Sequence, residues 1–187
     1  MEREHEQAKP AVFWAVAAGV AGTLLVMALL GLTIVYTGAY DPAATRDHTP
    51  LERWALSTSM RQAVQARAED LPDLGAADLE RGAIAYKEMC EHCHGAPGAR
   101  RAAWAEGMLP QPPDLTHAAN EWNAGEIAWI VRHGVRMTAM PAFGPTHDDA
   151  AIRDIAAFVE QLPTLTPARY ASLSESGKTG QDHGGEH

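Results

Sequence analysis

The sequence predicts an all-α protein, with one membrane-spanning helix, a linker helix and a small helical domain. Residues 11–36 contain no charged side chain, and later segments carry apolar residues at spacings of three and four. Such spacings are typical of helices, and no convincing strand pattern is visible. We divide the chain into a leader at 1–10, a transmembrane anchor at 11–36, a linker at 37–75, a helical domain at 76–163 and a disordered tail at 164–187.

Length and charge already exclude several classes of protein. A chain of 187 residues has room for one ordinary domain and an addition, but not for two full-sized domains. The 24 acidic residues outnumber the 15 basic ones, which gives a formal net charge of −9. This balance argues against a nucleic-acid partner, because phosphate binding needs clustered Lys and Arg. The two cysteines are too few for a disulfide-rich scaffold.

The apolar segment at 11–36 is long enough to cross a bilayer. As a helix it would extend about 39 Å at 1.5 Å per residue, against a hydrocarbon core of about 30 Å. The leader at 1–10 is net negative, whereas a signal peptide has a positive leader and a shorter apolar region. Trp14 lies near one end, and Tyr36 and Tyr40 near the other, where aromatic rings favour the headgroup region. We expect an uncleaved single-pass anchor in lipid, with flanking basic residues too evenly spread to set its orientation.

The linker is expected to contain one helix, at 50–68. Thr49 directly precedes it and is a suitable N-cap. Met60 and Val64 belong to a narrow apolar stripe on this helix, and Arg61 lies outside the stripe. Because the stripe is too thin to form a core alone, we expect it to lie on the helical domain, on the membrane surface or on a partner protein.

Three further helices are expected, at 78–93, at 121–132 and from about residue 146 to Pro163. Thr146 and Asp149 resemble a capping box at the start of the third. The third helix also has the clearest apolar face, formed by Ile152, Ile155, Ala156, Phe158, Val159 and Leu162. After Pro167 the chain is rich in Ser, Gly, Lys and Gln, a composition that favours disorder.

The segment Cys90–His94 has the Cys-x-x-Cys-His spacing of a c-type haem attachment site. Two thiols three residues apart near a helix end can each add to one vinyl group of a porphyrin, and His94 can then coordinate the iron. Structural zinc would need a second pair of ligands, and a dithiol redox motif would need a βαβ setting. A disulfide across so short a loop would stabilise little. We therefore expect one covalent haem c, bound through Cys90 and Cys93 with His94 as an iron ligand.

The second axial ligand is expected from a loop at 137–145. Pro141 keeps Met140 out of the helical conformation and removes a backbone donor, so a stiff loop can aim the Met140 thioether at a haem face. Met140 is the expected ligand, Met137 is the alternative, and a histidine is a further one. A second strong protein ligand closes the iron site, favours outer-sphere electron transfer and, as Met with His, raises the reduction potential.

Together these features resemble a class I cytochrome c domain over about residues 76–163. The resemblance is carried by Gly82, Tyr86, the run Cys90–Gly95, Pro113-Asp114-Leu115, Trp129, Gly134, the run Met140–Phe143 and the terminal helix. It implies a small all-α fold around one haem. It also implies that the first and last helices cross, which would bring Gly82 and Tyr86 against Phe158 or Val159.

The resemblance also implies a hydrogen bond at the site and a topology in the membrane. In the family a proline carbonyl accepts from the proximal imidazole; Pro113 matches this position best, and Pro110 is the alternative because segment 100–112 departs from the family pattern. Haem is attached to such motifs on the outer face of the cytoplasmic membrane. The leader would then be cytoplasmic, and the linker and haem domain periplasmic.

The function expected on these grounds is single-electron transfer by a membrane-anchored monohaem cytochrome in a respiratory chain, not catalysis. Its partners would be a membrane oxidase or a quinol- or substrate-oxidising complex. Two alternatives are a fixed cytochrome subunit of a larger membrane oxidase, reductase or dehydrogenase complex, and a haem enzyme or gas sensor in which Met140 dissociates. Four arginines near the motifs would pair with haem propionates, steer an acidic partner or form ordinary surface: Arg100, Arg101, Arg132 and Arg136.

Overall fold

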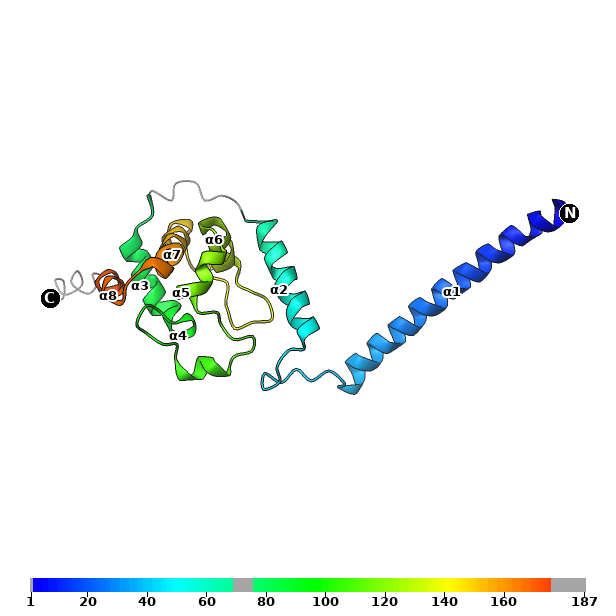
Figure 1. The fold of residues 1–187 in the computed structure, drawn as a ribbon, viewed down its shortest axis with the longest axis horizontal. Helices are drawn as coiled ribbons and strands as arrows, with labels where there is room; N and C mark the ends of the chain where they lie inside the picture. The colour runs from blue at the N-terminus through cyan, green and yellow to red at the C-terminus, as the bar shows by residue number, and fades with distance from the viewer. Residues whose placement is uncertain (1, 69–75, 176–187) are drawn as a thin grey trace. The chain divides into compact units, whose positions relative to one another are not determined.

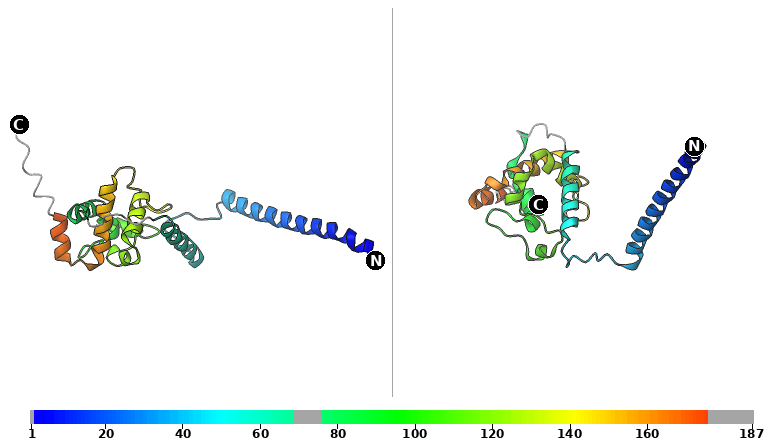
Figure 2. Two further views of the ribbon diagram at one scale, coloured as in Figure 1. Left: turned by 90° about the horizontal axis from the view of Figure 1, so that it is seen from above. Right: turned by 45° about the vertical axis from the view of Figure 1, so that its right-hand side comes forward.

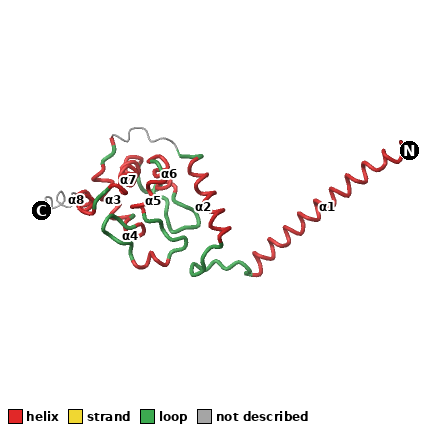
Figure 3. Tube along the Cα trace, viewed as in Figure 1, coloured by secondary structure: helices red, strands yellow, loops and turns green. Residues whose placement is uncertain are grey.

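The computed structural model describes residues 2–68 and 76–175, which form helices and connecting loops (Figure 1). Within these ranges there is no β-strand, as Figure 3 shows. An isolated bridge joins Ala96 and Ala99. The chain divides into two compact units at Arg46 and Asp47. The helices are α1 (Glu2–Thr37), α2 (Pro50–Gln65), α3 (Leu79–Met89), α4 (Glu91–His94), α5 (Leu115–Ala118), α6 (Ala124–His133), α7 (Asp149–Gln161) and α8 (Pro167–Glu175), with 3-10 turns η2 (Ala103–Gly107), η3 (Ala119–Glu121) and η4 (Leu162–Thr164). The predicted all-α class is confirmed.

The first unit is dominated by helix α1, whose stretch Val12–Thr37 is long and apolar enough to cross a membrane. None of the most apolar part of this stretch is buried inside the protein. Its threonine hydroxyls donate to carbonyls four residues earlier, as Thr23 does to Gly19 at 2.9 Å and Thr33 to Leu29 at 2.8 Å. Each hydroxyl is therefore satisfied within the helix, which is what a hydrocarbon environment requires.

The core of the second unit is the crossing of α3 and α7. A Cβ atom at Gly82 would lie 2.2 Å from the carbonyl oxygen of Asp154, so only glycine allows the two backbones to approach this closely. One turn further along α3, the ring of Tyr86 lies 5.5 Å from that of Phe158, and both side chains are fully buried. The expected contact between these helices is therefore present. The six apolar residues predicted for the face of α7 and its end are all buried.

Helix ends differ from the sequence-based prediction where a nearer polar side chain supplies the cap. Helix α7 begins at Asp149 with Asp148 as its N-cap, because the Asp148 carboxylate accepts from the Ala151 N–H at 2.8 Å. The predicted cap Thr146 instead donates to the Phe143 carbonyl. Helix α6 likewise begins three residues later than expected, where Asn123 and Glu126 form a capping box. The predicted helix at 78–93 is interrupted at Cys90 between α3 and α4.

The prediction of a disordered tail from residue 164 is wrong for its first part, because Pro167–Glu175 form helix α8 against α3. Tyr170 and Leu173 are each only 5% exposed, and the Tyr170 ring lies 6.2 Å from that of Phe158. These apolar anchors are few, and the polar composition around them hides the helix in the sequence. Residues 176–187 lie outside the described part of the chain.

Helix α2 lies at the edge of the second unit (Figure 2). Its N-terminus has the predicted cap: the Thr49 hydroxyl accepts from the Glu52 N–H, and the Glu52 carboxylate accepts from the Thr49 N–H at 2.7 Å. Of the three surfaces expected for its stripe, the structure shows the helical domain, since Val64 is 1% exposed. Arg61, outside the stripe, also contacts the domain: its guanidinium lies 4.6 Å from the centre of the Trp122 ring and pairs with Glu121.

Candidate haem site

The two cysteines lie at the junction of α3 and α4. Cys90 ends α3 with its N–H donating to the Tyr86 carbonyl at 2.8 Å. Its own carbonyl accepts from the N–H groups of Cys93 and His94 at 3.1 and 3.0 Å, which forms the single turn of α4. Both cysteines are half-buried, and they do not form a disulfide with each other. One helical turn therefore presents two thiols and an imidazole in the order that covalent haem attachment requires.

The His94 imidazole is held by a backbone carbonyl. Its Nδ1 lies 2.8 Å from the carbonyl oxygen of Pro113, the hydrogen bond that the family resemblance implies. A carbonyl oxygen only accepts, so Nδ1 carries the proton and Nε2 keeps the lone pair that a metal needs. Burial lowers the pKa of His94, although the hydrogen bond to Pro113 opposes this shift. The neutral, oriented imidazole is the form that binds iron.

Two tyrosine hydroxyls form hydrogen bonds to residues in or next to the Cys90–His94 motif. The Tyr86 hydroxyl donates to the carbonyl of Gly95 at 2.6 Å, and the Tyr170 hydroxyl donates to the carboxylate of Glu91. Gly95 has φ of 71°, a conformation that favours glycine. Tyr170 was missed by sequence reasoning because it lies 79 residues from Glu91, and no local signal connects them.

The methionine loop folds back on the end of α6. Phe143 N–H and Gly144 N–H donate to the carbonyls of Val131 and Arg132 at 3.1 and 3.0 Å. Within the loop, the Met140 N–H donates to the Thr138 hydroxyl at 3.1 Å. These bonds give the loop a fixed path on the last turn of α6.

The two methionines of this loop have different environments. Met140 is half-buried and packs against the hydrophobic core. Met137 is 73% exposed and has φ of 63°, so it occupies the tip of the turn. Both the packing and the exposure favour Met140 over Met137 as a ligand supplied from inside the fold.

The chemistry of the donor groups fits haem better than the competing kinds of site. In residues 2–68 and 76–175, no group of three or more His, Cys, Asp or Glu side chains could hold a metal ion alone. Burial raises the pKa of the Cys90 thiol to about 12, whereas a redox-active dithiol needs a lowered pKa. Several apolar side chains of this domain are half-buried and pack against its core: Met89, Leu115, Trp122, Met140 and Phe143.

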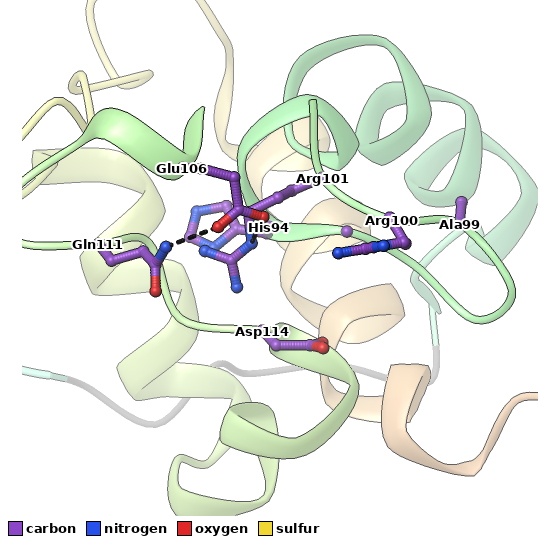
Figure 4. A pocket seen from close by; sticks show the side chains of 8 residues that line it. His94, Ala99, Arg100, Arg101, Glu106, Gln111 and Asp114 are labelled. Carbon is purple, nitrogen blue, oxygen red and sulfur yellow. Dashed lines mark hydrogen bonds and ion pairs between the residues drawn. The ribbon is translucent and has the colours of Figure 1, made fainter. Parts of the chain in front are cut away.

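A pocket of about 260 Å³ lies beside His94 and is lined by polar side chains (Figure 4). Arg100 and Arg101 both line it, but they differ: Arg100 is exposed, whereas the Arg101 side chain is only 15% exposed. Arg101 donates to the Pro112 carbonyl at 2.5 Å, and Arg132 pairs with Asp149 at 2.7 Å. Arg100 and Arg136 are exposed and have no ion pair among the described residues.

Comparison with known proteins locates one match, in the second unit. Residues 77–159 match the family described as cytochrome c oxidase, cbb3-type, subunit III. No curated protein and no solved structure matches the chain. The matched range contains all the predicted site residues: Cys90, Cys93, His94, Pro113 and Met140. Helices α1, α2 and α8 lie outside it.

Proposed function

We propose that this chain is a membrane-anchored monohaem electron carrier of a respiratory chain. The premise is that residues 77–159 are a class I c-type cytochrome domain, with covalently bound haem c and a role in electron transfer. The observation that carries the proposal is the oriented His94 imidazole, 2.8 Å from the Pro113 carbonyl, on the same turn as the two cysteines. The bound haem supplies a one-electron couple. The protein supplies a half-buried ligand set on tied segments of the chain.

In this proposal Cys90 and Cys93 form the thioether bonds, His94 Nε2 binds the iron, and the Met140 sulfur is the second axial ligand. The half-buried position of Met140 and its braced loop support this assignment, as does the exposure of Met137. Ligands held in fixed positions in both oxidation states keep the structural change on electron transfer small. Met/His ligation also raises the reduction potential, which suits donation to a terminal oxidase.

The anchor places the site at a membrane surface. Helix α1 fits a single-pass anchor, and we propose that it lies in the cytoplasmic membrane with residues 1–10 in the cytoplasm. The haem domain is then periplasmic, on the side where haem is attached to such motifs. Tethering raises the effective concentration of the carrier near membrane-bound redox partners.

A second function has its own support. The matching family is described as a subunit of a cbb3-type oxidase, which favours a fixed place in an oxidase complex over free diffusion. Extraction in mild detergent separates the two: a lone carrier migrates as a small monomer, whereas a subunit co-purifies with the other chains of its complex.

Visible spectroscopy of the purified full-length chain tests whether it is an electron carrier whose iron does not bind an exogenous ligand. We expect a reduced-minus-oxidised spectrum of one haem c, and no change in the Soret band when carbon monoxide is added to the reduced protein, because Met140 closes the iron site. An apoprotein prepared without the haem-maturation proteins is the blank. An immediate Soret shift with carbon monoxide would instead indicate a haem enzyme or gas sensor.

The anchor is tested by removing it. A chain that begins after Tyr40 and carries another export signal should be a soluble red protein, since the second compact unit starts at Asp47. The full-length chain, expressed in parallel, should remain with the membranes until detergent is added. A shortened chain that fails to incorporate haem would show that the boundary of the haem domain is misplaced.

A further inference from the structure

The segment at 110–113 contains three prolines and has few backbone donors of its own. Pro110, Pro112 and Pro113 lack an N–H, so the segment cannot form a regular ladder, and its carbonyls need donors from elsewhere. Two consecutive carbonyls find them: Pro112 accepts from Arg101 Nη1 at 2.5 Å, and Pro113 accepts from His94 Nδ1 at 2.8 Å. The carbonyl that orients His94 is thus adjacent to one that Arg101 holds.

The two donors, His94 at the end of α4 and Arg101, are joined by a short loop held by backbone hydrogen bonds. Ala96 and Ala99 exchange two backbone hydrogen bonds of 2.9 Å, and the Ala102 N–H donates to the His92 carbonyl at 2.8 Å. These bonds fix the path from His94 to Arg101. The loop therefore presents two donors at a fixed spacing to two successive carbonyls of the proline segment.

The Arg101 guanidinium also lies near a carboxylate. Its Nε lies 3.9 Å from one carboxylate oxygen of Glu106, and the other oxygen accepts from the Gln111 amide at 2.9 Å. Figure 4 shows Glu106 between Gln111 and Arg101 beside His94. Because Gln111 directly precedes Pro112, these contacts close a ring of polar interactions around segment 101–112. It lies within segment 100–112, which departs from the pattern of the family that this domain resembles.

We propose that Arg101 is a positioning residue, which holds the Pro112 carbonyl and thereby keeps the Pro113 carbonyl on the imidazole of His94. The inference rests on the proposed ligation of iron by His94. A hydrogen bond of this kind fixes the ring orientation of a metal-binding histidine and raises its basicity. Arg100, its neighbour on the same pocket, is exposed and forms no ion pair within the described ranges, so it provides a matched control.

The test follows the His94 Nδ1 proton by NMR in the reduced full-length holoprotein. In Arg101→Leu we expect this proton to exchange with solvent about tenfold faster and to shift upfield, because its hydrogen bond opens more often. Arg100→Leu should stay within about twofold of the unaltered protein, since it removes only a surface charge. Arg101→Lys keeps a charged donor for the Pro112 carbonyl and should restore most of the protection.

Unchanged exchange in Arg101→Leu, or an equal effect of Arg100→Leu, overturns the proposal. If Arg101→Leu gives no folded red protein, Glu106→Gln is tested in its place, because Glu106 is half exposed and its carboxylate lies 3.9 Å from Arg101 Nε. An unaltered His94 proton in that variant then overturns the proposal. If the His94 ring protons of the unaltered protein lack the upfield shift that a haem imposes on its axial ligand, the ligand assignment itself is wrong, which is a separate outcome.

Discussion

Replacement of Met140 by alanine should abolish the sulfur-to-iron charge-transfer band of the oxidised protein and lower its reduction potential. In the proposed ligation the Met140 thioether stabilises the ferrous state, and without it water or an exogenous ligand would occupy the sixth position. We expect a fall on the order of 0.1 V, a part of the roughly 0.8 V range over which axial ligands tune haem proteins. Potentiometry followed in the visible spectrum measures both effects in one titration.

Met137→Ala is the control for this experiment. Met137 is exposed at the tip of the same loop, so its replacement should leave the band, the potential and the Soret band under carbon monoxide unchanged. In Met140→Ala carbon monoxide should now bind, while the covalent haem content stays the same because Cys90 and Cys93 are untouched. Loss of the band in Met137→Ala in place of Met140→Ala would assign the ligand to the other sulfur.

The parts of the site that the sequence predicted are local or have a chemical signature. Cys90, Cys93 and His94 lie within five residues, and two thiols followed directly by an imidazole are typical of covalent haem attachment. Pro113 was predicted only through the family resemblance, and the structure contains its hydrogen bond to His94.

The contacts that the sequence did not predict join residues that are distant or chemically ordinary. Tyr170 reaches Glu91 across 79 residues, and nothing near either residue indicates the other. Arg101 appeared only as one of four arginines, because a side chain that binds a backbone carbonyl has no pattern in the sequence. Tertiary packing alone distinguishes it from Arg100.

The same difference explains which helices could be predicted from the sequence and which could not. Helix α7 was predicted because apolar residues repeat on one face over its whole length. Its start was misplaced because Thr146 and Asp148 are both acceptable N-caps. Which of them caps the helix depends on the path of the loop that connects α6 to α7. Helix α8 was missed because Tyr170 and Leu173 give it only two anchors, and its stability comes from α3.

Replacement of Gly82 by alanine should strongly destabilise the haem domain. The added Cβ would lie 2.2 Å from the Asp154 carbonyl oxygen and 2.9 Å from the Phe158 Cβ, and a backbone atom of α7 cannot move aside without shifting the helix. We expect a loss of about 3 kcal/mol, at the upper end of overpacking effects, which corresponds to a fall in melting temperature of about 12 °C or more. Circular dichroism of the holoprotein during heating measures this loss.

The Gly82→Ala substitution should also affect the haem site, because α3 ends at Cys90. A displaced α3 carries Tyr86 away from Gly95 and changes the placement of both thiols, so Gly82→Ala should also yield less covalently attached haem per chain. Gly107→Ala is the control: no atom lies within 4 Å of its added Cβ, and it should melt within a few degrees of the unaltered protein. If Gly82→Ala and Gly107→Ala have the same melting temperature, α3 and α7 do not approach each other as closely as described. The close crossing would then not be what positions the cysteines.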